Sequence, residues 1–376
     1  MKLFTASLAT LVALVSVIQA TPTHQFDHFF PGWNARVQAI LRDNCSEPYA
    51  EYLTGNVNQT LGKLSLVNPV IDCVLEAFPE SRKAELATGA LVLGLIPTIL
   101  QSIGSSTAET ALVGLRRPLL GFLISAGSPA VSMMKTSEFA TAIAELAGGH
   151  GAPEGFGIAS LRWSRGRGTW ALLIGLVQYV AVGAAVANVL HLAWELGIYA
   201  VAIFAPDTVF GVPLWTLGAA AIHLAGCLAV WVRVRTRILD ARDDADYAAL
   251  SKPLNTWVPN QFIPAVFHPP IVLELRQDAG SSVWFYILSW VISIGILAQV
   301  AFGTLVLSGL LFFSLVDCLT IVGRYTLSAV VCRAVVRFEL SGMMAALVPA
   351  HSKHTNEALE PEQVVLTDWK GVRRGM

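Results

Sequence analysis

The chain has 376 residues, of which 54% are hydrophobic and only 14% are charged. Soluble proteins carry about 25% charged residues, so this deficit and the long uncharged runs place the chain in the membrane class. The formal net charge of −1 gives no case for nucleic-acid binding. The partner that the composition predicts is the lipid bilayer.

The first stretch, residues 1–20, has the pattern of a secretory signal peptide. A short basic region at Lys2 precedes an apolar run from Leu3 to Ile18, and Ala20 ends a sequence that fits a cleavage site. A cleaved signal peptide is the first interpretation, and an uncleaved anchor is the alternative. Both place the next segment in the lumen or outside the cell.

Residues 21–85 form a polar segment that is too small for a strong core of its own. It contains two cysteines, Cys45 and Cys73. In an oxidising compartment we expect them to form a disulfide, and two buried free thiols are the alternative. Asn58 and Asn44 each begin a glycosylation sequon, although a disulfide at Cys45 would hinder modification of Asn44.

Uncharged runs predict five transmembrane spans. The first three cover residues 86–108, 168–194 and 208–232. The run 279–316 would be about 57 Å long as one helix, nearly twice the ~30 Å hydrocarbon core, so we expect two antiparallel spans that break near Gly303. The second is predicted to carry Asp317 near its cytosolic end and to leave the membrane at Arg324. Residues 325–347 are predicted as an interfacial helix.

The apolar run 118–134 is predicted to enter the membrane without crossing it. It is short and is broken at Gly127-Ser128-Pro129. If it is re-entrant or interfacial, every basic cluster falls in the cytosol, as the positive-inside bias favours. The alternative stays open because the run is just long enough to span. With the first interpretation, the loop 233–280 and the tail 348–376 are cytosolic.

These expectations define an all-α fold, a polytopic membrane bundle over residues 86–347 with a small disulfide-tied luminal segment before it. The predicted location is the endoplasmic reticulum, another endomembrane or the plasma membrane. On the predicted span 168–194, Asn188 and Gln178 are expected to form hydrogen bonds between helices.

Four ionisable side chains are the candidates for function: Glu195, Asp317, His191 and His223. A charge near the centre of a membrane helix costs about 2.5–3.5 kcal/mol, which makes such groups functional candidates. His191 and Glu195 share one helix face, and hairpin packing could bring His223 towards them. The three could hold a metal or simply hydrogen-bond one another. Because the spacing is weak evidence, neither a metal nor a cofactor is predicted.

Asp317 and Glu195 can also be interpreted as purely structural residues. Asp317 precedes Arg324 by seven residues on the same helix face, so a structural ion pair and a functional role are equally open. Glu195 lies near the predicted luminal boundary, where it can simply end a helix. The sequence has no GxxxxGK[ST], HExxH or GxSxG motif, which argues against an ATP-driven pump, a zinc protease and a serine hydrolase.

Four stretches carry a resemblance to a known family: DCVLEA at 72–77, LVLGLIPTIL at 91–100, LRRPLL at 115–120 and SAGSPA at 125–130. In these the chain resembles an uncharacterised fungal family of multi-pass membrane proteins with an N-terminal signal sequence. The resemblance covers mainly residues 70–130. It implies a membrane protein of the fungal secretory pathway and transfers no catalytic residues.

Two functions fit these features. The first is a non-enzymatic membrane protein that binds, senses or helps move a lipophilic small molecule. The alternative is a membrane-embedded cyclase or isomerase acting on a lipid or isoprenoid-like intermediate of secondary metabolism, with Glu195 and Asp317 as acids and His191 or His223 as partner. The alternative requires its carboxylates around one enclosed cavity, whereas the first function does not.

Overall fold

The structure is a computed structural model that describes residues 24–54, 66–129, 131–132, 169–206, 208–238, 261–267, 271–275 and 279–355. The predicted signal peptide, the sequon at Asn58 and the tail beyond Thr355 lie outside the described residues. Asn44 is described, and it is exposed at the end of a helix.

Five helical stretches are long and apolar enough to cross a membrane. They are Glu80–Ile103, Trp170–Tyr199, Gly211–Arg233, Val283–Ser308 and Leu315–Met343, with mean hydropathies between 1.5 and 2.1. Only 28–39% of each apolar window is buried inside the protein, because large side chains such as Leu176, Leu228, Trp290, Leu297 and Leu327 point outwards. This surface suits lipid rather than water, and the prediction of an all-α bundle with five spans is confirmed.

The first span is two helices in sequence, α5 (Glu80–Gly94) and α6 (Ile96–Ile103). The interruption falls at Leu95, just before Pro97, where the proline lacks the N–H that an unbroken helix would need. The other spans are single helices: α10 (Thr169–Tyr199), α11 (Gly211–Arg233), α14 (Ala279–Ser308) and α15 (Leu315–Thr355).

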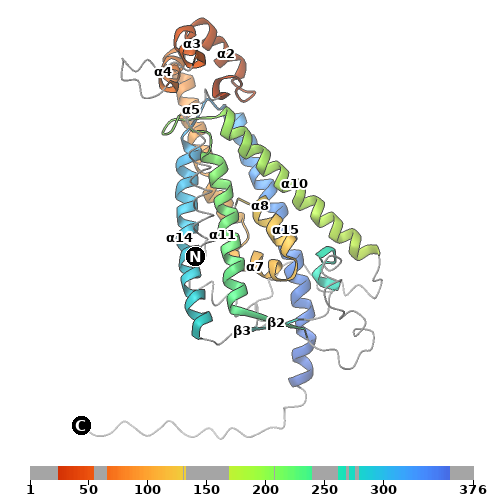
Figure 1. Ribbon diagram of the computed structural model, residues 1–376. Helices are drawn as coiled ribbons and strands as arrows, with labels where there is room; N and C mark the ends of the chain where they lie inside the picture. Colours follow the sequence, from red (N-terminus) through yellow and green to blue (C-terminus); the bar gives the residue numbers. More distant parts are fainter. Residues whose placement is uncertain are drawn as a thin grey trace, which may run out of the picture.

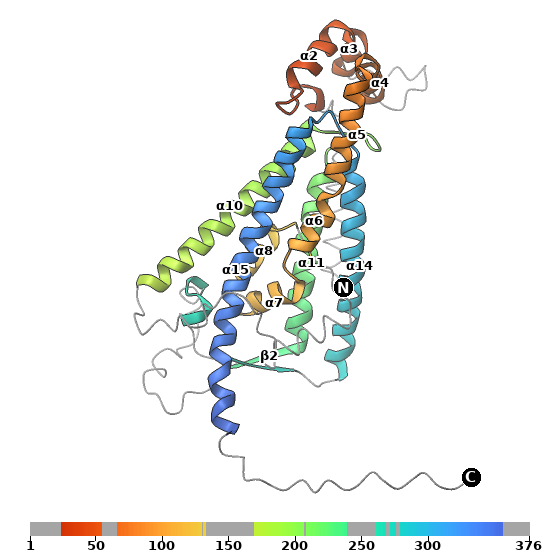
Figure 2. The same cartoon turned by 180° about the vertical axis from the view of Figure 1, so that it is seen from behind.

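Two short helices lie inside the bundle without crossing it. They are α7 (Thr107–Arg116) and α8 (Pro118–Gly127), each about 15 Å long against a ~30 Å hydrocarbon core. They pack on α10, α11 and α15, as Figure 2 shows. A Cβ on Gly121 would lie 2.7 Å from the Cα of Gly114, so only glycine allows the two helices to approach this closely. The run 118–134, predicted to enter the membrane without crossing it, contains in its described part the short helix α8, which forms a hairpin with α7.

The polar N-terminal segment folds as 3₁₀-helix η1 (His24–Phe26) and helices α2 (Asn34–Asp43), α3 (Ser46–Thr54) and α4 (Val67–Ala77). We call the described residues 24–54 and 66–78 the N-segment; it caps one end of the bundle (Figure 1). The predicted disulfide between Cys45 and Cys73 is present, with the two Cα atoms 5.9 Å apart. An aromatic core that includes Phe26, Phe29 and Trp33 packs next to this disulfide and stabilises the N-segment.

The last two spans are joined by a tight turn at the N-segment end of the bundle. Strand β4 (Leu310–Leu311) pairs antiparallel with β1 (Val201–Ala202), and Phe312 has a positive φ of 65°. The side chain of Phe312 is inserted into the N-segment, where its ring lies 5.8 Å from that of Phe29. The turn thereby attaches the N-segment to the bundle.

The position of this turn corrects a prediction. The break was expected near Gly303, but Gly303 lies inside α14. A Cβ there would meet the indole Nε1 of Trp215 at 2.2 Å, so this glycine serves close helix packing and not a turn. The fifth span is consequently Leu315–Met343. Asp317 stands at the N-segment end of this span and not at the opposite end, where it was predicted, and residues 325–343 belong to the span instead of an interfacial helix.

At the opposite end, β2 (Val234–Ile238) and β3 (Ile271–Leu275) form an antiparallel pair. The 3₁₀-helix η4 (Ala265–Phe267) packs against α15. Both belong to the loop 233–280, which returns to the bundle in its described parts.

Candidate functional site

Four polar side chains of α10 and α15 form a cluster at the surface of the bundle. Arg324 donates from Nε to Oδ1 of Asn188 at 3.0 Å and from Nη1 to Oε2 of Glu195 at 2.8 Å. Its Nη2 lies 3.2 Å from Nδ1 of His191. We call these four residues the Arg324 cluster. One arginine on α15 thus collects three side chains from α10.

The Arg324 cluster faces outwards. The side chains of Arg324 and Glu195 are 29% and 28% exposed, and that of His191 is 59% exposed. Arg324 is nine residues into α15, roughly 14 Å along the helix axis, which is within the depth of a hydrocarbon core. Beside it Leu190, Trp194 and Leu327 are exposed as well, so polar and apolar groups share one lipid-facing surface.

The structure confirms the interhelical role predicted for Asn188 and Gln178. Asn188 donates through Nδ2 to the Oγ of Ser328 at 2.8 Å and to the carbonyl of Arg324 at 3.0 Å. Gln178 donates through Nε2 to Oε1 of Glu339 at 2.6 Å. Both amides therefore join α10 to α15.

Asp317 is not paired with Arg324. It is the third residue of α15 and accepts a 2.7 Å hydrogen bond from the Oγ of Ser314, whose Oγ in turn accepts from the N–H of Asp317. It also accepts from the N–H of Gly32 in the N-segment at 3.2 Å. Two helical turns, about 10 Å, separate it from Arg324. Its contacts are those of a helix cap that also holds the N-segment.

His223 is buried on α11 and does not join His191 and Glu195. Among the described residues, no three His, Cys, Asp or Glu side chains are grouped as metal ligands. His191 and Glu195 do lie together, with Nδ1 3.2 Å from Oε2, but the third partner is Arg324, which cannot ligate a metal.

Sequence reasoning missed a buried network at the other end of the bundle. Arg117 is fully buried and donates from Nη1 to Glu339 at 2.7 Å and to Gln178 at 2.5 Å. Its Nε donates to the carbonyl of Gln261 at 2.6 Å, and the second oxygen of Glu339 accepts from the N–H of Ala265 at 3.0 Å. The sequence did contain one signal of this network, because Glu339 is the lone acidic residue in the apolar stretch 325–347.

Arg333 lies in the stretch 325–347, which was predicted as an interfacial helix, and its side chain contacts the bundle instead. It donates to the carbonyls of Ile103, and of Gly104 at 2.5 Å, where α6 ends. The last carbonyls of a helix have no partner within it, so this arginine turns into the bundle to satisfy them. It does not extend to the membrane surface.

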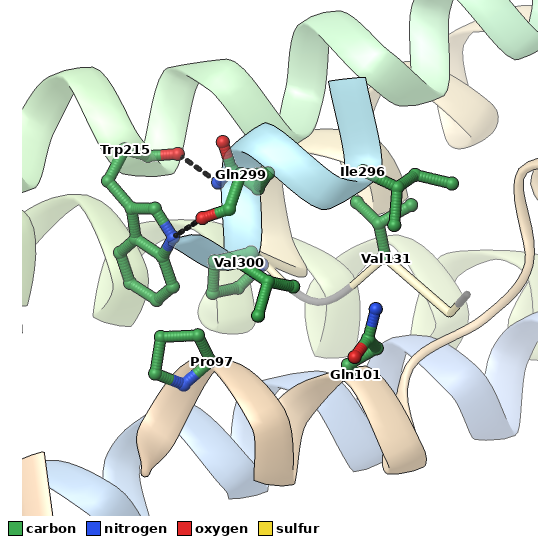
Figure 3. A pocket seen from close by; sticks show the side chains of 8 residues that line it. Pro97, Gln101, Val131, Trp215, Ile296, Gln299 and Val300 are labelled. Carbon is green, nitrogen blue, oxygen red and sulfur yellow. Dashed lines mark hydrogen bonds between the residues drawn. The ribbon is translucent and has the colours of Figure 1, made fainter. Parts of the chain in front are cut away.

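A small pocket lies between α6, α11 and α14. Pro97, Gln101, Trp215, Gln299 and their neighbours line it, and none of the lining residues is ionisable (Figure 3). Its empty volume is about 220 Å³ including the part open to the surroundings. Glu195, Asp317 and His191 all lie elsewhere.

Comparison with protein-family models, with curated proteins and with solved structures finds no match to this chain. The class of this protein therefore follows from its architecture. Five apolar helices make the chain a multi-pass membrane protein, with a short helical hairpin inside the bundle and a disulfide-linked N-segment at one end.

Proposed function

We propose that this protein binds an amphipathic, lipophilic molecule that enters sideways from the bilayer, in order to sense it or help move it. The Arg324 cluster supports the proposal. It places a hydrogen-bonding, ionisable group on a surface that is otherwise apolar. The polar part of a ligand would contact His191, and its chain would lie along Leu190, Trp194 and Leu327.

The energetic cost of these groups argues for a function. A charge near the centre of a membrane helix costs about 2.5–3.5 kcal/mol on insertion scales. Arg324 lies roughly 14 Å along α15, and its pair with Glu195 offsets part of such a cost. Joining α10 to α15 does not require the pair, because Asn188 and Gln178 already link the two helices. It also does not require a histidine that is 59% exposed.

The alternative, a cyclase or isomerase, receives no specific support. Glu195 is held by Arg324 and Asp317 by Ser314 and the N-segment. The pocket in Figure 3 is lined by neither carboxylate. The arrangement required for an acid working in an enclosed cavity is therefore absent from the pocket that the described residues form there. With the predicted topology, the bound molecule would come from the luminal leaflet of an endomembrane or of the plasma membrane.

Photolabelling of the intact protein in lipid nanodiscs tests the proposal. A photoactivatable phosphatidylcholine is incorporated, and labelled peptides are identified by mass spectrometry. We expect labelling concentrated on α10 and α15, reduced about threefold or more by Arg324→Gln or His191→Ala, since each removes a hydrogen bond. Arg82→Gln is the matched control, because Arg82 forms an exposed ion pair on α5. Even labelling of all lipid-facing helices, unchanged in the variants, would overturn the proposal.

A further inference from the structure

The guanidinium of Arg324 has more hydrogen-bond donors than the Arg324 cluster uses. Its Nε donates to Asn188, its Nη1 donates to Glu195, and its Nη2 lies next to Nδ1 of His191. A guanidinium carries five N–H groups. Two of them, one on Nη1 and one on Nη2, therefore have no partner among the described residues.

The carboxylate of Glu195 likewise has an unused acceptor. Its Oε2 receives the hydrogen bond from Arg324 and lies 3.2 Å from Nδ1 of His191, whereas its Oε1 accepts from none of the described residues. Oε1 is not a buried atom, so it is accessible from outside the protein. The cluster thus presents a positive group with free donors beside a negative group with a free acceptor.

The cluster lies close to the N-segment end of the bundle. Glu195 is four residues before the last residue of α10, about 6 Å along the helix axis. Arg324 is deeper on α15, but helical side chains tilt towards the N-terminus of their helix, which for α15 is the N-segment end. The polar group of a lipid can therefore reach both side chains from the membrane surface while its chains stay among the apolar side chains.

We propose that the Arg324 cluster selects amphiphiles whose polar group carries an anionic acceptor next to an ammonium with N–H donors, as phosphoethanolamine does. This inference rests on the proposed function and names its ligand class. The phosphate accepts from the free N–H groups of Arg324, and the ammonium donates to Glu195.

Two related headgroups lack one half of this match. The quaternary ammonium of phosphocholine has no N–H group, so it forms no hydrogen bond with Glu195. The headgroup of phosphatidylmethanol has a phosphate but no cation and no donor. It contacts Arg324 and leaves the negative charge of Glu195 without a partner from the ligand.

Replacing part of the lipid in the nanodiscs tests this inference. Equal shares of the phosphatidylcholine are replaced by phosphatidylethanolamine or by phosphatidylmethanol with the same acyl chains. The loss of labelling of α10 and α15 by the photoactivatable phosphatidylcholine is then compared. We expect phosphatidylethanolamine to displace the label about threefold better than phosphatidylcholine, which is the effect of one partly exposed ion pair. Phosphatidylmethanol should displace it no better than phosphatidylcholine.

Glu195→Gln should reverse this order. The variant removes the acceptor of the ammonium and leaves Arg324 with an uncompensated positive charge. The preference for phosphatidylethanolamine should therefore disappear, and phosphatidylmethanol should become the strongest competitor. Glu85→Gln is the matched control, because Glu85 is 26% exposed and also pairs with an arginine, at 2.6 Å on α5. It should leave the original order intact.

The outcomes separate this inference from the proposed function. Labelling that is concentrated on α10 and α15, but displaced equally by phosphatidylethanolamine and phosphatidylcholine, overturns the ligand class while the proposed function stands. Labelling that is not concentrated there overturns the proposed function itself. The comparison in the unaltered protein decides the ligand class even if Glu195→Gln fails to fold. If the variant folds and still prefers phosphatidylethanolamine, the inference is refuted as well.

Discussion

Replacing Glu339 by glutamine should destabilise the protein strongly, because it removes the counter-charge of a fully buried arginine. The side chains of Arg117 and Glu339 are 0% and 1% exposed. The Glu339 carboxylate accepts hydrogen bonds from Arg117, Gln178 and the N–H of Ala265, at 2.7, 2.6 and 3.0 Å. Breaking a buried pair on one side typically costs about 3–5 kcal/mol, so we expect Glu339→Gln to fall in this range.

The free energy of unfolding in detergent micelles, followed by denaturant titration, measures this effect. Glu85→Gln provides the control: Glu85 forms an ion pair with Arg82 at 2.6 Å, but the two side chains are 26% and 45% exposed. Exposed pairs contribute about 0–1 kcal/mol. Arg117→Met should also be strongly destabilising. The double variant of Arg117 and Glu339 should lose less than the sum of the two single losses, because it leaves no charge unpaired.

Two results would refute this reasoning. If Glu339→Gln costs no more than Glu85→Gln, the guanidinium of Arg117 does not depend on that carboxylate for its burial. If the two single losses simply add in the double variant, Arg117 and Glu339 do not interact energetically, despite the 2.7 Å contact.

Three further predictions concern the N-segment and its attachment. Replacing both Cys45 and Cys73 by serine should lower the stability of the N-segment by about 3.5 kcal/mol, the loop-closure value for a bridge across 28 residues; limited proteolysis should then cut this segment first, and unchanged cleavage would contradict the expectation. Asp317→Ala should lower the free energy of unfolding by about 1–2 kcal/mol, because the helix cap is lost, and should leave photolabelling of α10 and α15 unchanged. Loss of labelling in a variant of normal stability would instead assign Asp317 to the binding site. Burial and, as a smaller effect, the negative charge of Asp27 raise the pKa of the Tyr49 phenol. The unfolded chain therefore loses this proton at a lower pH than the folded protein, and the free energy of unfolding should decline above about pH 10. Tyr49→Phe should make this decline, followed by circular dichroism, less steep, and an equally steep decline would rule out this cause.

The sequence alone determined the features that depend on local composition. Spans can be recognised because each needs about 20 consecutive apolar residues whatever their neighbours are. Their number was predicted correctly, although the fifth span was expected to end at Arg324 and instead covers Leu315–Met343. The disulfide was predictable because the N-segment offers Cys45 only one partner, Cys73. The amides of Asn188 and Gln178 were predictable in role, because an amide in an apolar helix needs a partner.

Other features depend on which helices pack together, and only the tertiary structure decided them. Gly303 reads as a break in the sequence, yet Trp215 from another helix packs where its side chain would be. The chain turns instead at Phe312, because the N-segment provides the aromatic pocket that holds this residue.

The choice of electrostatic partners was also decided by the tertiary structure. Arg324 pairs with Glu195 on another helix and not with Asp317 on its own, since Asp317 caps α15 and contacts the N-segment. Arg117 meets Glu339 across 222 residues of sequence. Hydrophobicity adds up along a stretch of chain and can be read there. A charge inside a bundle pairs with whatever the packing brings within about 3 Å, and the sequence alone does not contain that distance.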